Sequence, residues 1–215
     1  MTRVPRAIGI VLAVSATLTA VLPRSAYAQE PSGMTGGLSI GGGWLRLGGA
    51  SADPATELVQ LGDRNGGGPT VDLRLGRFVA PRAAVLRELA LATTSETAFD
   101  DTVGVRLGGT ELLFGGATTD LSSFVTVGAA QFWVAPRVWI RGGIGVGYLS
   151  RTLYLPDSVD LTLDKGYGFA VLGGTGVEVW RVQHLALDAQ VQFSTFAVGG
   201  LRVNAPVLQL GVSFW

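Results

Sequence analysis

Apolar residues alternate with polar or small residues through the last nine residues of the chain, VLQLGVSFW. Successive side chains of a β-strand point to opposite faces, so a period of two predicts a strand with one apolar face and one polar face. The apolar phase consists of Leu208, Leu210, Val212 and Phe214. Such a strand either pairs inside a soluble sheet or turns its apolar face to lipid.

Seven further segments show alternation, most clearly residues 184–193, where Leu185 and Leu187 oppose Asp188 and Gln190. The other six are residues 38–47, 71–75, 83–92, 121–131, 138–148 and 166–180. Residues 83–92 (AAVLRELALA) also contain strong helix formers, so a short helix is the alternative there. A possible hairpin at VGVRLGG and TELLFGG would raise the number of strands from eight to ten.

The first 28 residues are predicted to be a secretory signal peptide, with the barrel domain at residues 29–215. Arg3 and Arg6 precede the apolar run 7–22, and Ala26-Tyr27-Ala28 has the small residues of a cleavage site. A transmembrane anchor is the alternative, but the apolar run is short for a bilayer. The full chain has 16 basic and 16 acidic residues, and cleavage would remove three of the arginines. The remaining chain would therefore have a small net negative charge. No nucleic-acid surface is therefore expected.

Composition narrows the fold class further. The chain is 47% hydrophobic and has 32 glycines and no cysteine, so disulfides and thiolate metal sites are excluded. Residues 29–215 contain no continuous apolar run near the length of a membrane helix. In a bilayer, only a closed barrel satisfies the backbone hydrogen bonds of alternating strands. The prediction is an all-β, closed, antiparallel transmembrane β-barrel of eight strands with up-and-down topology.

The connections between these segments alternate in length. Short joins fall at residues 79–82, 133–137 and 181–184, and longer ones at 48–69, 93–120, 151–165 and 194–204. Outer-membrane barrels have short periplasmic turns and long extracellular loops. The near repeat of FVAPRAAV and WVAPRVWI indicates two equivalent corners, with Pro81 and Pro136 as turn formers.

Aromatic residues gather near both ends of the predicted strands, as expected of residues at membrane interfaces. The predicted girdles are Trp133, Trp139 and Trp180 beside the short turns, and Tyr148 and Tyr167 beside a long loop.

The glycine-rich segments RGGIGVGYLS and GYGFAVLGGTGVEVW, the signal peptide and the closing VLQLGVSFW resemble the small outer-membrane β-barrel proteins, the group with the outer-membrane protein A and X types. The resemblance implies a location in the outer membrane of a diderm bacterium. It also implies that the last strand, with its terminal aromatic residue, is read by the barrel-assembly machinery. Phe214 and Trp215 are the predicted assembly signal, and Phe214 is the residue that ends the apolar phase.

Turning the apolar phases outward places five charged residues inside the barrel near the short turns: Arg74, Glu88, Arg141, Glu178 and Asp188. An eight-stranded barrel is just wide enough for side chains to fill it, and buried charges need partners. A luminal ion-pair network is therefore predicted, with the constriction of a solute pore as the alternative. Arg87 would then face lipid, where an arginine at the midplane costs roughly 2–4 kcal/mol.

No catalytic, cofactor or metal site is predicted. His184 is the only histidine and has no serine beside it in its predicted turn. Asp100-Asp101 or Asp157, Asp160 and Asp164 could contribute to a calcium site, but neither group fits a dedicated calcium loop, so solvated loops are expected. GTG (174–176) and GGG (41–43) lie within predicted strands and do not form phosphate loops.

The predicted function is that of a non-enzymatic outer-membrane barrel with a side-chain-filled lumen and a structural or surface-interaction role through long extracellular loops. Its expected partners are outer-membrane lipids and, during biogenesis, the assembly machinery, and the protein is expected to be a monomer. The alternatives are a channel for small or apolar solutes and a soluble periplasmic β-sandwich or lipid carrier.

Overall fold

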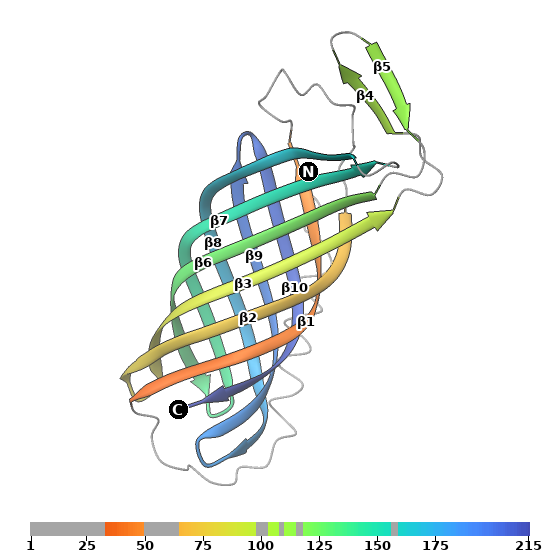
Figure 1. Ribbon diagram of the computed structural model, residues 1–215. Helices are drawn as coiled ribbons and strands as arrows, with labels where there is room; N and C mark the ends of the chain where they lie inside the picture. Colours follow the sequence, from red (N-terminus) through yellow and green to blue (C-terminus); the bar gives the residue numbers. More distant parts are fainter. Residues whose placement is uncertain (1–32, 50–64, 98–102, 108–109, 115–117, 156–158) are drawn as a thin grey trace, which may run out of the picture.

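A computed structural model describes residues 33–49, 65–97, 103–107, 110–114, 118–155 and 159–215, which contain ten strands, eight of which close into a barrel (Figure 1). The strands are β1 (Met34–Gly48), β2 (Asn65–Ala80), β3 (Ala83–Thr97), β4 (Val103–Leu107), β5 (Thr110–Phe114), β6 (Thr118–Ala135), β7 (Val138–Leu155), β8 (Val159–Val182), β9 (Leu185–Val198) and β10 (Leu201–Phe214). The predicted signal peptide lies outside the described residues. Nowhere in the described ranges is there a helix long and apolar enough to cross a membrane.

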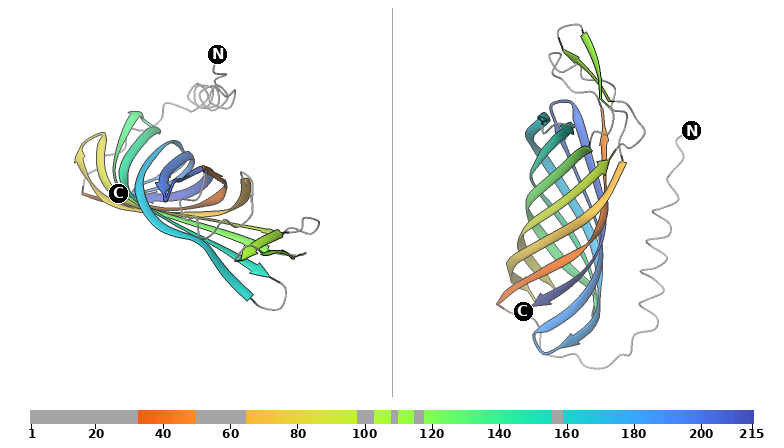
Figure 2. Two further views of the ribbon diagram at one scale, coloured as in Figure 1. Left: turned by 90° about the horizontal axis from the view of Figure 1, so that it is seen from above. Right: turned by 45° about the vertical axis from the view of Figure 1, so that its right-hand side comes forward.

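Eight strands form one closed antiparallel barrel in the order β1-β10-β9-β8-β7-β6-β3-β2. All eight predicted segments lie in these strands, and Figure 2 shows the barrel from above and from a second side. Residues 83–92 belong to strand β3, so the helical alternative is wrong. The extra hairpin exists, but β4 and β5 form a separate two-stranded sheet beyond one end of the barrel, and β3 pairs directly with β6. The ten-stranded barrel and the soluble sandwich are therefore wrong.

Two of the predicted long loops are mostly strand. Strands β9 and β10 are joined by the two residues Gly199 and Gly200, whose φ angles of +53° and +86° suit glycine in a tight hairpin turn. The strands β7 and β8 likewise stay paired as far as Leu155 and Val159. The small and polar residues at 194–204 resemble a loop in composition, so the sequence does not reveal the pairing of β9 with β10 there. Such residues also occur in strands whose other face is covered.

The corners at the short turns are built alike. The register shifts between Phe78 and Ala80, between Trp133 and Ala135, and between Glu178 and Trp180, which marks a β-bulge before each turn. Four backbone amides donate across this rim: Phe78 to the Gly33 carbonyl at 2.9 Å, Trp133 to Arg82 at 3.0 Å, Glu178 to Arg137 at 2.8 Å and Trp215 to His184 at 3.1 Å. The corners that the repeated sequence predicts to be equivalent are so, and the last residue occupies a fourth equivalent position.

Glycines inside the barrel make room for large side chains from neighbouring strands. A Cβ atom at Gly176 would overlap the ring of Trp139, and one at Gly147 would overlap the ring of Phe196. A Cβ atom at the outward-facing Gly128 would meet no other atom within 4 Å. The interior is therefore packed to a degree that the outer surface is not.

Gly176→Ala is expected to lower the free energy of unfolding by about 1–3 kcal/mol, because the added methyl group overpacks against Trp139. Urea unfolding of the protein in lipid vesicles, followed by the mobility of folded and unfolded bands on a gel, measures the change. Gly128→Ala is the matched control, since its methyl group enters open space. Equal effects of the two substitutions would contradict this packing.

Candidate functional site in the barrel lumen

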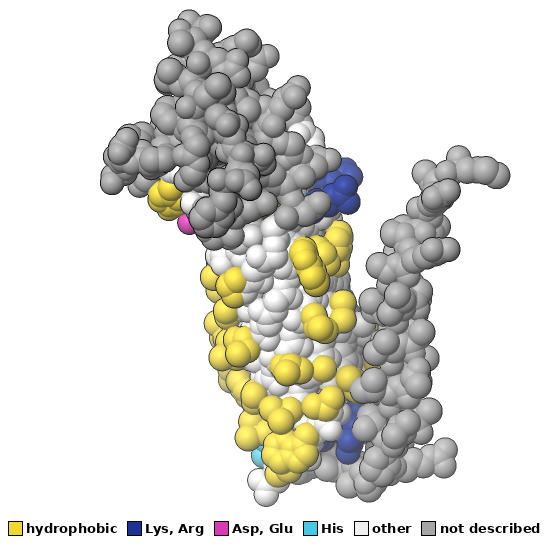
Figure 3. Space-filling view, turned by 90° about the vertical axis from the view of Figure 1, so that its right-hand side faces the viewer, with side chains coloured by type: hydrophobic (Ala, Val, Ile, Leu, Met, Phe, Trp, Pro, Cys, Tyr) yellow, Lys and Arg dark blue, Asp and Glu magenta, His cyan; other side chains and the backbone are white. Residues whose placement is uncertain are grey.

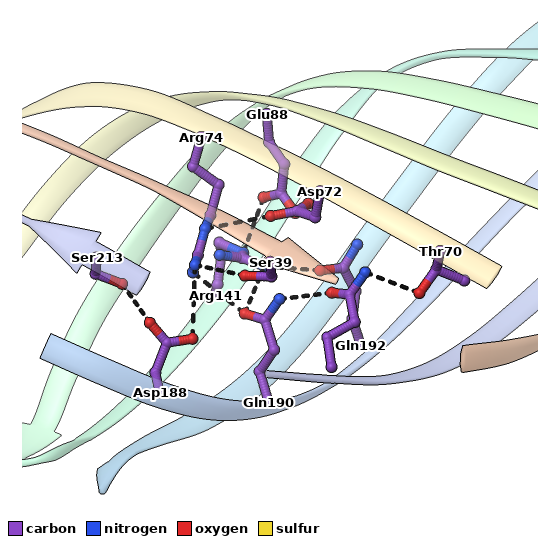
Figure 4. A network of polar contacts seen from close by, with 11 residues as sticks. Ser39, Thr70, Asp72, Arg74, Glu88, Arg141, Asp188, Gln190, Gln192 and Ser213 are labelled. Atoms are coloured by element: carbon purple, nitrogen blue, oxygen red, sulfur yellow. Dashed lines mark hydrogen bonds and ion pairs between the residues drawn. The ribbon is translucent and has the colours of Figure 1, made fainter. Parts of the chain in front are cut away.

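Arg74 of β2 and Arg141 of β7 lie at the centre of a buried polar layer (Figure 4). Arg141 Nε lies 2.8 Å from Glu88 Oε2, and Arg74 Nε lies 3.2 Å from Asp72 Oδ1. Arg74 also reaches Asp188 Oδ1 at 3.6 Å, and Asp188 accepts a hydrogen bond from the Ser213 hydroxyl. The arginines are only 3% and 4% exposed. Two buried arginines thus bind three carboxylates from three other positions of the barrel wall.

Amide side chains extend this layer across the lumen. Both arginines donate to glutamines: Arg74 to Gln190 Oε1 at 3.2 Å and Arg141 to Gln192 Oε1 at 2.7 Å. Gln190 Nε2 then donates to Gln209 Oε1 at 2.6 Å, and Gln209 Nε2 to the Thr70 hydroxyl at 3.1 Å. Each amide nitrogen donates to the next acceptor, so the hydrogen bonds of Gln190 and Gln209 join β9, β10 and β2 across the lumen.

Trp139 lies inside the barrel against both arginines. The guanidinium carbons of Arg141 and Arg74 are 4.9 Å and 5.7 Å from its ring centroid, within the range of cation–π contacts. Its side chain is 1% exposed. The prediction that Trp139 belongs to a lipid-facing girdle is therefore wrong, because this residue shares the inward phase of Arg141.

A second group closes the rim at the short turns. Glu178 accepts hydrogen bonds from Trp133 Nε1 at 2.8 Å and from Arg181 Nε at 2.8 Å. The Arg181 guanidinium also lies 4.6 Å from the ring centroid of Trp215, and Phe78 packs on Trp133 with ring centroids 5.2 Å apart. Trp133 and Trp215 both pack against the luminal core. The girdle prediction is thus also wrong for Trp133, which binds a luminal carboxylate.

Apolar side chains fill the lumen on the other side of the polar layer, toward the ends of the strands that carry the long connections. Leu149 and Val203 are fully buried there. The layer also includes Leu45, Leu47, Val125, Leu172, Phe196, Val198 and Leu201. From the short turns upward, the described lumen therefore holds an aromatic and ionic rim, a polar layer and an apolar layer.

The outer surface of the barrel has the opposite character. Leu38, Ile40, Leu208 and Leu210 are exposed on β1 and β10, and similar residues cover the other strands. On the face in Figure 3, apolar side chains cover the middle of the barrel and basic side chains lie near its ends. Such a surface suits lipid rather than water.

The remaining aromatic residues lie on this outer side. Trp180 beside a short turn is 51% exposed and Tyr167 is 75% exposed, while Tyr148 is half-buried and packs against Tyr167 in a tilted arrangement with ring centroids 4.9 Å apart. Phe214 also faces outward. Trp180, Tyr148 and Tyr167 are therefore at positions where interface aromatics are expected.

The structure places all five predicted luminal charges inside the barrel, where they belong to two separate groups. Arg74, Glu88, Arg141 and Asp188 share the polar layer, whereas Glu178 belongs to the rim group. Sequence reasoning omitted Asp72, Ser39, Thr70, Gln190, Gln192, Gln209 and Ser213. The alternation could have found them, because Asp72 has the phase of Arg74 and the two β9 glutamines have the phase of Asp188.

Features that would support catalysis or metal binding are sparse in the described ranges. His184 is exposed in the turn between β8 and β9, where its carbonyl accepts the Trp215 amide. No cluster of three potential metal ligands is found there. Asp100, Asp101 and Asp157 lie outside those ranges, and Asp160 and Asp164 belong to β8.

The outward apolar surface and the closed strands define a transmembrane β-barrel. Its fold is that of the small eight-stranded barrels of the bacterial outer membrane. The attachment invasion locus protein of Yersinia pestis, Ail, solved with the heparin analogue sucrose octasulfate, superposes with a TM-score of 0.55 at 15% identity, over 85% of this chain and 99% of Ail. Neisserial surface protein A superposes with a TM-score of 0.50 at 14% identity, over 86% of this chain and 99% of that one.

No protein-family model and no curated protein sequence matches the chain. The structural likeness therefore gives the fold, and the location follows from this fold together with the apolar surface: the protein is an outer-membrane barrel of a Gram-negative cell envelope.

Arg141→Gln is expected to lower the free energy of unfolding by about 3–5 kcal/mol, because it leaves the buried Glu88 carboxylate without its ion-pair partner. Adding Glu88→Gln should recover at least half of the loss, since both charges of the pair are then gone. Urea unfolding in lipid vesicles measures both effects. Arg202→Gln, at an exposed position on β10, is the control. A double variant less stable than Arg141→Gln alone would contradict the pairing.

Proposed function

We propose that this protein is a non-enzymatic outer-membrane barrel with a closed lumen, which acts through the end that carries its long connections. The observation that carries this proposal is the layered filling of the lumen. A water path would have to cross the Glu178 rim, the paired polar layer and the apolar layer in turn.

The energetics of these layers argue against opening under ordinary conditions. Separating Arg141 from Glu88 would leave charges with few other partners, at a cost of several kcal/mol per ion. The apolar layer above is closed mainly by packed aliphatic and aromatic side chains, which offer water few hydrogen-bond partners. A passive channel for polar solutes is therefore disfavoured.

The end of the barrel that carries the long connections, opposite to the short turns, offers a surface for contacts with other molecules. The strands β7 and β8 stay paired well beyond the luminal layers, and the β4–β5 hairpin lies at the same end (Figure 1). Loops of outer-membrane barrels at this end face the extracellular side. The name of Ail refers to attachment and invasion, but the surface-interaction role is proposed for this chain because of its own long connections.

Single-channel recording tests the closed lumen. Purified, refolded protein in a planar bilayer is expected to give no reproducible conductance steps, because the proposed closed lumen would offer ions no continuous water path. A general porin refolded in the same way is the positive control for insertion and detection. Reproducible steps from the wild-type protein, absent from a mock preparation, would contradict the closed lumen and favour the channel alternative.

Assembly remains the proposed role of the last two residues, with the barrel-assembly machinery as the partner. Phe214 faces lipid and Trp215 packs inward against the luminal core, so the two residues do different things in the folded barrel.

Deleting Phe214 and Trp215 is expected to reduce insertion into the outer membrane, because the strand that closes against β1 loses both its last lipid-facing side chain and a rim contact. Membrane fractionation and the heat-modifiable mobility of the folded protein measure insertion. His184→Ala, which changes an exposed turn residue at the same rim, is the control. Equal insertion of the two variants would contradict the proposed signal.

A further inference from the structure

Two arginines, Arg77 of β2 and Arg87 of β3, project from the lipid-facing side of one hairpin. Both alternate with buried neighbours, Phe78 and Glu88, and both are exposed. In the register, Arg87 lies opposite Leu75 and Arg77 lies opposite Val85. The two arginines are therefore diagonal neighbours, about 7–8 Å apart at the backbone and within reach of a shared ligand through their long side chains.

This arginine pair has no acidic residue opposite it. The residues paired with the two arginines on adjacent strands are Met34, Leu75, Val85 and Gly128. Two like charges side by side in an apolar surface are unfavourable unless an anion lies between them. Guanidinium groups bind phosphate oxygens through paired, charge-assisted hydrogen bonds.

An apolar groove begins beside Arg87 on the same outer surface. It has a volume of about 480 Å³ and is lined by residues of β3, β6 and β7, namely Val85, Leu86, Gly128, Ala129, Ala130, Gly142, Gly143 and Ile144. Arg87 is paired directly with Gly128, which is paired in turn with Ile144. The arginine therefore stands at one edge of the groove.

Two of the glycines that line this groove, Gly128 and Gly142, are not required by the packing of the barrel itself. A Cβ atom at Gly128 would meet nothing within 4 Å, and one at Gly142 would meet a single backbone oxygen at 4.0 Å. These positions differ from Gly176 and Gly147, where an added Cβ would strike a luminal ring. The hollow is thus open toward the lipid side.

The depth of Arg87 along the barrel fits a contact with the headgroup of a lipid in the leaflet beside the short turns. Arg87 is the fifth residue of β3, counted from its first residue at the short-turn rim. At about 3.3 Å per residue and a strand tilt of about 35–45°, its backbone lies on the order of 10 Å from that rim. A long arginine side chain reaches from this depth to the headgroup level.

We propose that Arg77, Arg87 and the groove over Gly128 and Gly142 form a binding site for a glycerophospholipid of the periplasmic leaflet. The phosphate lies between the two guanidinium groups, and one acyl chain lies in the groove. The site rests on the membrane location of the barrel and is independent of the role proposed for the loops. It also accounts for the two exposed arginines, Arg77 and Arg87, within a mostly apolar surface.

Native mass spectrometry of the detergent-purified protein with added phosphatidylglycerol tests the site. The wild-type protein is expected to retain one phospholipid. Arg77→Gln with Arg87→Gln should weaken retention at least about tenfold through loss of the charge-assisted phosphate contacts. Gly142→Leu and Gly128→Leu should each weaken lipid retention by filling the groove.

The control variant is Arg46→Gln with Arg202→Gln, which removes exposed arginines of β1 and β10 far from the groove. It should retain lipid like the wild type.

Heat-modifiable gel mobility first establishes that each variant is folded. Diacylglycerol with the same acyl chains, which lacks the phosphate, should be retained less than phosphatidylglycerol, and inorganic phosphate should not displace the lipid. Unchanged retention by the Arg77/Arg87 variant, equal loss in the Arg46/Arg202 control, or equal retention of diacylglycerol would each overturn the proposal. A dimer that Gly142→Leu abolishes, without bound lipid, would show instead that a second copy of the chain occupies the groove.

Discussion

The pairing of β1 with β10 is the contact on which the rest of this structure depends. It runs from Gly36 opposite Phe214 to Gly48 opposite Arg202 and turns eight strands into a ring without edges. Inside a bilayer, backbone groups on an open edge would have no water to bind, so this pairing makes the membrane location possible. It also fixes the width of the lumen, and a ring of eight strands leaves room only for side chains.

That narrow lumen explains why the buried arginines take their partners from other luminal side chains. Arg74 and Arg141 are almost fully buried, so they bind carboxylates, amide oxygens and the face of Trp139 in place of water. The charges do not make the barrel stable by themselves, because their desolvation offsets much of their attraction. Their arrangement instead selects this register, since a slip of one residue on β2, β3, β7, β8 or β9 would turn an inward-facing charge toward lipid.

Much of this architecture is predictable from alternation, because the period of two identifies both the strands and the inward charges. It fails where the period is broken or ignored. The β-bulge beside each short turn sets two consecutive residues such as Val179 and Trp180 outward. Closeness to a turn misplaces Trp139 in the outer girdle, although its phase is that of the inward-facing Arg141. The apolar luminal layer is hard to predict, because on β8 the inward-facing Ala170 and Leu172 alternate with the outward-facing Phe169 and Val171, so both faces are apolar there.

Cysteine cross-linking tests the closure of the barrel most directly, because the chain contains no cysteine of its own. Ile40 and Leu210 lie opposite each other on β1 and β10, and directly opposed residues in antiparallel strands have the Cα spacing that a disulfide needs. Ile40→Cys with Leu210→Cys should form an intramolecular disulfide in membranes under a lipid-soluble oxidant, whereas Ile40→Cys with Leu185→Cys should not. Failure of the first pair, or preferential linkage of Ile40→Cys to Leu208→Cys, would contradict the closed barrel in this register.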